Sequence, residues 1–129
     1  MPEAPSLSPA LRAALRVQDT VVVSSRDSSG EGKTRMWFAL TLEGTLYLLT
    51  PSFSLKARRW ESDPWVRVRA GREVIEGTVE LVTLEEAAGD EPLLLERFTL
   101  AGASTREALA WMLESGSHRL FRVRPGAGC

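Results

Sequence analysis

Two stretches of the sequence carry residue types suited to binding an anion. In order along the chain they are Arg35-Met36-Trp37-Phe38-Ala39-Leu40 and Thr50-Pro51-Ser52-Phe53-Ser54-Leu55-Lys56. The first has the pattern of a strand, and the second lies where a further strand ends and a helix begins, so it offers free backbone N–H groups at the positive end of a helix dipole. Thr50 and Ser54 add hydroxyl donors, and Lys56 and Arg35 add positive charge. Together the stretches predict a phosphate site.

The other residue types that commonly do chemistry give weaker patterns. His118 is the single histidine, so no histidine-rich metal site is expected, and we interpret it as structural or exposed. Cys129 is the only cysteine and lacks the positive surroundings that lower a thiol pKa, so no catalytic thiol is predicted. Arg58 and Arg59 follow Lys56 as in some nucleic-acid sites, but nearby acidic residues favour a solvated helix face. We expect no metal and no nucleic-acid partner.

The bulk composition narrows the class of protein. The chain has 129 residues with 16 Lys+Arg against 17 Asp+Glu, a net charge of −1, so no global positive field attracts nucleic acid or an anionic membrane. Residues 1–17 contain an early acidic residue, three prolines and no long apolar run, which predicts neither a signal peptide nor a membrane span. A lone cysteine gives no disulfide framework. We expect one domain over residues 1–129, frayed at 1–7 and 125–129, in the cytoplasm.

Six segments have the pattern of β-strands, because they are rich in β-branched and aromatic residues or alternate between apolar and polar side chains. They are residues 20–25, 33–42, 45–50, 65–70, 73–82 and 118–124. Residues 27–32 are interpreted as a polar loop, and Glu43-Gly44 as a tight turn. Gly77, inside the fifth strand, predicts a bulge or a close backbone approach.

Four further segments are predicted to be helical. Ser8-Pro9 has the pattern of an N-cap and first residue for a short amphipathic helix over one end of the sheet, and Ser54 caps two helical turns that end before Asp63-Pro64. The other two are residues 93–98 and a helix opened by the capping box Ser104-x-x-Glu107, and Thr83-x-x-Glu86 has the same spacing. Hairpin connections favour a mainly β fold, a six-stranded antiparallel β-barrel with flanking helices, over a doubly wound sheet.

The order and spacing of these motifs resemble the pyridoxamine 5'-phosphate oxidase-like split-barrel family, part of the flavin and deazaflavin oxidoreductases. The similarity runs from about Thr20 to Val82 and is weaker at the last helix and strand. The first motifs that carry the resemblance are Arg-Met-x-φ-x-φ from Arg35, an acidic-Gly turn and Tyr-x-x-Thr ending at Thr50. The later ones are Ser-x-Lys ending at Lys56, Asp-Pro-Trp-Val-x-Val from Asp63 and Val-Ile-x-Gly-x-Val from Val74. The resemblance implies an FMN-binding split β-barrel.

In that family FMN, or in some branches the deazaflavin F420, lies at a dimer interface. Carried over by position, the resemblance implies that the phosphate is held by Arg35, Thr50, Ser54 and Lys56, that the strand with Met36 and Phe38 borders the flavin, and that Trp37 faces its ring. It implies an oxidoreductase for an unknown small molecule, in which the flavin carries the redox chemistry and no catalytic side chain is assigned. A homodimer is also expected because four tryptophans exceed what a small barrel readily buries alone.

Three positions depart from the family pattern. Leu40 and Leu55 stand where basic residues are common, and Arg72 stands where a glutamine is common, so the predicted phosphate site has fewer contacts than in the oxidase. The oxidase's substrate-binding residues cannot be traced, and pyridoxine chemistry is not predicted. Two alternatives therefore stay open on the same fold. One is a non-catalytic carrier of flavin or haem, and the other is a cofactor-free dimeric module.

Overall fold

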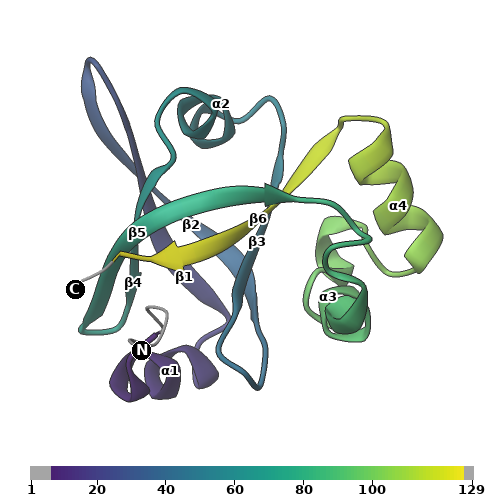
Figure 1. The fold of residues 1–129 in the computed structure, drawn as a ribbon, viewed down its shortest axis with the longest axis horizontal. Helices are drawn as coiled ribbons and strands as arrows, with labels where there is room; N and C mark the ends of the chain where they lie inside the picture. The colour runs from purple at the N-terminus through teal and green to yellow at the C-terminus, as the bar shows by residue number, and fades with distance from the viewer. Residues whose placement is uncertain (1–6, 127–129) are drawn as a thin grey trace, which may run out of the picture.

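Six antiparallel strands close into a barrel in the computed structural model, which describes residues 7–126 (Figure 1). The strands are β1 Thr20–Asp27, β2 Gly30–Leu40, β3 Leu46–Pro51, β4 Trp65–Ala70, β5 Glu73–Val82 and β6 His118–Pro125. Their order around the barrel is β1-β2-β3-β6-β5-β4, and β4 pairs back onto β1. This confirms the predicted antiparallel barrel.

Four α-helices flank the barrel. They are α1 Pro9–Arg16, α2 Leu55–Ser62, α3 Glu91–Arg97 and α4 Arg106–Glu114, with single 3-10 turns at Ala88–Asp90 and Thr99–Ala101. The Ser8 hydroxyl accepts a hydrogen bond from the Leu11 N–H at 3.1 Å, and the Ser54 hydroxyl accepts one from the Ala57 N–H at 3.2 Å, so both predicted N-caps are confirmed. Figure 1 shows α1 and α2 at opposite ends of the barrel.

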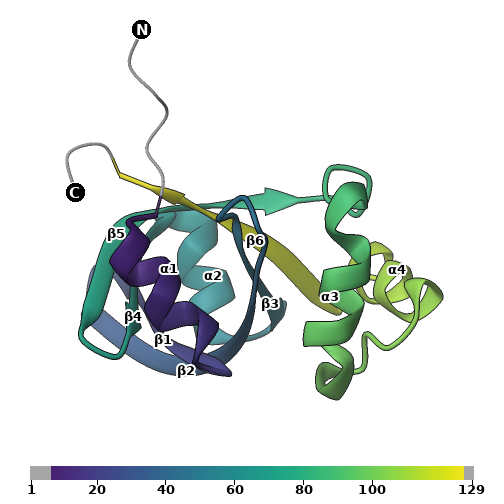
Figure 2. The same ribbon diagram turned by 90° about the horizontal axis from the view of Figure 1, so that it is seen from below.

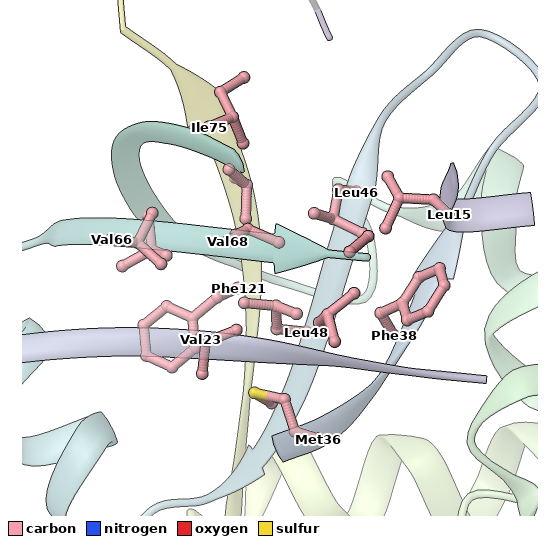
Figure 3. Close-up of a cluster of buried hydrophobic side chains, with 14 of the residues drawn as sticks. Leu15, Val23, Met36, Phe38, Leu46, Leu48, Val66, Val68, Ile75 and Phe121 are labelled. Carbon is pink, nitrogen blue, oxygen red and sulfur yellow. The ribbon is translucent and has the colours of Figure 1, made fainter. Parts of the chain in front are cut away.

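The barrel interior is filled by alternate side chains from every strand and closed by the two end helices. Leu11 and Leu15 of α1 and Trp60 of α2 are almost fully buried in this core. The ring of Trp60 meets that of Phe121 edge-on at 5.1 Å between centroids, and its N–H donates to the Trp65 carbonyl. Figure 3 shows this packing around Val23, Met36, Phe38, Leu46, Leu48, Val66, Val68, Ile75 and Phe121. The interior is therefore a packed core that holds the strand ends in fixed positions.

A second apolar cluster covers the outside of the barrel wall. Helices α3 and α4 pack there against β2, β3 and β6, on the side away from the barrel interior (Figure 2). Leu46 and Leu48 point into the barrel, whereas Tyr47 and Leu49 belong to the outer cluster with Leu94. Burial of both faces explains why β3 is a continuous apolar run rather than an alternating one.

Several predicted boundaries differ from the structure. The expected loop at 27–32 is instead a tight hairpin, in which Asp27 pairs with Gly30 and its carboxylate accepts from the Ser29 N–H at 2.8 Å and from the Ser29 hydroxyl. The last helix is capped by Thr105, not by Ser104. The Thr83-Glu86 capping box forms with both reciprocal hydrogen bonds, but it closes a turn and not an α-helix.

The close backbone approach predicted at Gly77 is present. A Cβ built on Gly77 would lie 2.1 Å from the Arg124 carbonyl oxygen on β6, well inside contact distance, so only glycine fits. At the chain ends, residues 1–6 and 127–129 of the expected frayed segments lie outside the described residues, whereas Leu7 is buried in the barrel core and Pro125 ends β6. Across residues 7–126 none of the helices has the length and hydropathy needed to cross a bilayer.

Candidate functional site

A cavity of about 430 Å³ opens on the outer barrel wall where β3 ends and α2 begins. This volume lies within the range of about 300–1,000 Å³ that is common for small-molecule sites. We call it the Lys56 cavity. Its described lining residues are Thr20, Arg35, Met36, Trp37, Leu49, Thr50, Pro51, Lys56, Ala101 and His118. They include two cationic side chains and no carboxylate, so the cavity favours an anion.

Lys56 is a cation in this cavity that lacks an acidic partner. It is half-buried in the first turn of α2, and it makes no ion pair or hydrogen bond with any residue of the described part of the chain. Burial without a carboxylate partner disfavours the ammonium form and lowers the pKa of Lys56 below its usual value of 10.5. An anion in the cavity would supply the missing partner.

The start of α2 adds backbone donors beside this ammonium group. The Ser54 carbonyl and hydroxyl accept from the Arg58 and Ala57 N–H groups, respectively. The N–H groups of Leu55 and Lys56 have no acceptor within residues 7–126. These donors lie at the positive end of the helix dipole, which is a favourable location for phosphate oxygens.

Arg35 and Trp37 reach the cavity from the outer face of β2. The Arg35 guanidinium donates one hydrogen bond to the Thr20 hydroxyl at 3.0 Å. Its other N–H groups have no partner among the described residues and remain available to a ligand. Trp37 pairs with Thr20 in the strand register, and the residue is 39% exposed. A charged fork and an aromatic surface thus lie side by side on one wall.

The hydroxyl groups of Thr50 and Ser54 lie together where β3 ends and α2 begins. The two hydroxyls are 3.1 Å apart, and the Thr50 side chain is completely buried. Ser54 is next to the cavity but is not among its lining residues, because its hydroxyl caps α2. Its role in the structure is to fix the helix start that carries Lys56.

Met36 and Phe38 point the other way from Arg35 and Trp37. Alternate residues of a strand face opposite sides, and Figure 3 shows both side chains directed into the barrel core. Met36 still borders the Lys56 cavity, whereas Phe38 does not. The Phe38 carbonyl instead accepts from Arg97, whose guanidinium also lies 5.4 Å from the Phe38 ring centre.

His118 is a cavity residue that sequence reasoning missed. It starts β6, and the antiparallel register places it opposite Pro51 at the end of β3. Only the pairing of β3 with β6 brings His118 to the cavity, and no local sequence pattern predicts that pairing. His118 is half-buried, and burial lowers its pKa below the usual 6.5, so the ring is neutral at pH 7.

The remaining candidate residues fall outside the cavity. Arg58 is exposed, and Arg59 pairs with the Asp27 carboxylate at 2.8 Å, which ties the β1–β2 hairpin to α2. Leu55, at one departure from the family pattern, is 59% exposed. Within residues 7–126 no three His, Cys, Asp or Glu side chains gather in a way that could hold a metal ion.

Comparison with known proteins shows the fold and not the activity. No family model matches the sequence, and no curated protein matches it. Among solved structures, a putative pyridoxamine 5'-phosphate oxidase from Listeria innocua is 17% identical, with a TM-score of 0.62 over 90% of each chain. A heme storage protein from Vibrio cholerae is 18% identical, with a TM-score of 0.66 over 96% of this chain and 93% of that one. The chain has the split-barrel fold of pyridoxamine 5'-phosphate oxidase-like proteins.

A third solved structure is longer than this chain. It is a protein of unknown function, Atu2129 from Agrobacterium tumefaciens, with 20% identity and a TM-score of 0.68. The alignment covers 95% of this chain but only 59% of that protein. This chain therefore spans about three fifths of the length of that protein.

Proposed function

We propose that the protein binds a phosphate-bearing flavin, FMN with F420 as the alternative, in the Lys56 cavity and acts as an oxidoreductase on a small molecule. The observation that carries this proposal is the unpaired, half-buried Lys56 ammonium in a cavity lined by a second cation and no carboxylate. The sequence motifs that resemble split-barrel flavoproteins include these same residues, and the fold agrees with that resemblance.

The chain's own residues would bind and orient the cofactor. Lys56, the free N–H groups at the start of α2 and the Arg35 fork would hold the phosphate by charge-assisted hydrogen bonds. Trp37 would offer its exposed ring surface to the isoalloxazine. The bound flavin would supply hydride transfer, so the protein needs no acid–base pair for the redox step itself.

The proposal includes a homodimer. Large apolar side chains are exposed around the cavity, namely Trp37 at 39%, Leu55 at 59%, Leu100 at 79% and Phe53 at 80%. A second copy would cover these side chains and shield the flavin ring from water. Sedimentation at micromolar concentration is expected to give twice the mass of 14.2 kDa, and a strictly monomeric species would contradict this part of the proposal.

A non-catalytic haem carrier is the second candidate. It is favoured by the position of His118 in the wall of the Lys56 cavity, since a neutral imidazole is a common ligand of haem iron. Arg35 and Lys56 would then pair with the haem propionates. The fold similarity to a heme storage protein is compatible with this candidate.

One experiment separates these candidates. The purified protein is titrated with FMN, F420 and hemin, and absorbance spectra are recorded together with equilibrium dialysis. Saturable binding of FMN or F420 with a perturbed flavin spectrum supports the proposed function. A Soret band that depends on His118, with no flavin binding, supports the carrier, and binding of none of the three contradicts both.

A further inference from the structure

A second cavity, of about 560 Å³, lies between the end of β5, the start of β6 and α4. Figure 1 shows α4 beyond the start of β6, outside the barrel. We call this space the Ala110 cavity. His118 lines both cavities, so the two spaces share a wall. The side chains that make the Ala110 cavity mainly apolar are Leu81, Val82, Leu84, Ala110, Leu113 and Leu120.

The charges around the Ala110 cavity differ from those of the Lys56 cavity. Its one lining arginine, Arg119, forms an ion pair with Glu61 and is therefore compensated. Two exposed carboxylates, Glu85 and Glu114, also line it. A second phosphate or carboxylate would meet net negative charge here, so the lining selects against anions, and its many apolar side chains favour an apolar molecule.

The hydrogen bonds around His118 define what its free nitrogen can do. The Ser117 hydroxyl donates to the Met112 carbonyl at 3.3 Å, and the same oxygen lies 3.0 Å from His118 Nδ1. A hydroxyl has one proton, so both contacts are hydrogen bonds in the tautomer in which Nδ1 donates to Ser117 and Ser117 donates to Met112. The neutral ring then carries its lone pair on Nε2, which has no partner among the described residues. A hydroxyl or amino group on a ligand would satisfy it.

We propose that the Ala110 cavity binds a neutral, mainly apolar small molecule that carries a hydroxyl or amino group, with His118 Nε2 as the acceptor. The assignment of this molecule as the substrate rests on the proposed function, because only a flavin in the Lys56 cavity makes the neighbouring space a substrate site. Binding itself does not require the flavin and is measured separately.

The test uses 2-naphthol as a probe, since it is neutral, apolar and carries one hydroxyl donor. Isothermal titration calorimetry on the full chain is expected to show saturable binding to the wild type. Ala110→Phe fills the cavity, and Leu81→Lys places a charge at its mouth on a residue that is 60% exposed, so the fold is retained. We expect each to weaken 2-naphthol binding by about tenfold or more. Glu107→Phe, at an exposed position of α4 outside the cavity, is the matched control and keeps the wild-type affinity.

The hydrogen bond is tested with 2-methoxynaphthalene, which has the same ring system but no donor. Its affinity for the wild type is expected to be about fivefold lower than that of 2-naphthol, the usual scale of one hydrogen bond. Absence of saturable 2-naphthol binding, equal affinities in all four proteins, or equal affinities for the two naphthalenes would overturn the proposal. The same proteins are also titrated with FMN, which tests flavin binding in the Lys56 cavity separately from 2-naphthol binding in the Ala110 cavity. Failure to bind FMN would contradict only the proposed function.

Discussion

Replacing Lys56 by alanine is the perturbation that most clearly tests the role of its charge. The ammonium group is half-buried and has no partner within residues 7–126, so its whole charge is available to a ligand. A hydrogen bond to a charged group contributes about 1.5–3 kcal/mol, which corresponds to a loss of FMN affinity of roughly ten- to a hundredfold in Lys56→Ala. Flavin fluorescence titration measures this loss directly. The fold is expected to survive, because the Lys56 side chain makes no hydrogen bond or ion pair with the described residues.

Arg58→Ala is the matched control for this experiment. Arg58 lies on the same helix and is exposed, and its side chain makes no hydrogen bond or ion pair with the described residues, so its truncation should leave FMN affinity unchanged. Equal affinities in the wild type and Lys56→Ala would refute the reasoning. An equal loss in both variants would also refute it, because it would indicate a diffuse basic surface instead of a defined site.

The lowered pKa of Lys56 adds a pH dependence to the same prediction. Only the protonated amine attracts phosphate, so the contribution of Lys56 to FMN affinity is present at low pH and is lost as pH rises through the pKa of Lys56. Because burial places that pKa below 10.5, the loss begins at a lower pH than an ordinary lysine would give. The Lys56→Ala variant should not show this transition, and a wild type whose affinity follows the variant's pH profile would contradict the assignment.

Two further predictions concern the fold. Gly77→Ala places a Cβ against the Arg124 carbonyl and should lower the free energy of unfolding in urea by about 1–3 kcal/mol, whereas Gly89→Ala, which meets nothing within 4 Å, should not lower it measurably. Tyr47 is the only tyrosine, and burial and its 2.6 Å hydrogen bond to Asp90 raise its pKa to about 12. Its phenolate absorbance should therefore appear near pH 12 instead of 10. The free energy of unfolding should fall as pH rises from 10 to 12, because only the folded state keeps the proton there. In Asp90→Asn the absorbance transition should move to lower pH.

Much of the barrel could be predicted because its strands are defined by local patterns. Trp65 to Ala70 alternates, and a glycine turn separates it from the fifth strand, so both boundaries agree with the structure. The hairpin at Asp27–Gly30 was interpreted as a loop because its residues are polar, yet ladder pairing and the Asp27 carboxylate order it. The N-cap of the last helix was predicted one residue too early, at Ser104 instead of Thr105, because both residues carry a hydroxyl that can cap a helix.

The candidate site was predictable only where it depends on neighbouring sequence. The motifs placed Arg35 on a strand and Lys56 at the start of a helix, and the family resemblance added Trp37. The structure brings all three to one cavity. Strand alternation directs Phe38 into the core, away from that cavity. His118 could not be found from local patterns, because it reaches the cavity only through the pairing of β6 with β3, which are separated by three α-helices and two strands along the chain.

The central claim, that the Lys56 cavity recognises the phosphate of a flavin, is tested most directly by comparing FMN with riboflavin. The two ligands share the isoalloxazine and ribityl groups and differ only in the phosphate. Titrated against the wild-type protein in one buffer, FMN is expected to bind at least about tenfold more tightly than riboflavin, the scale of one charge-assisted hydrogen bond. Equal affinities for FMN and riboflavin would contradict the claim.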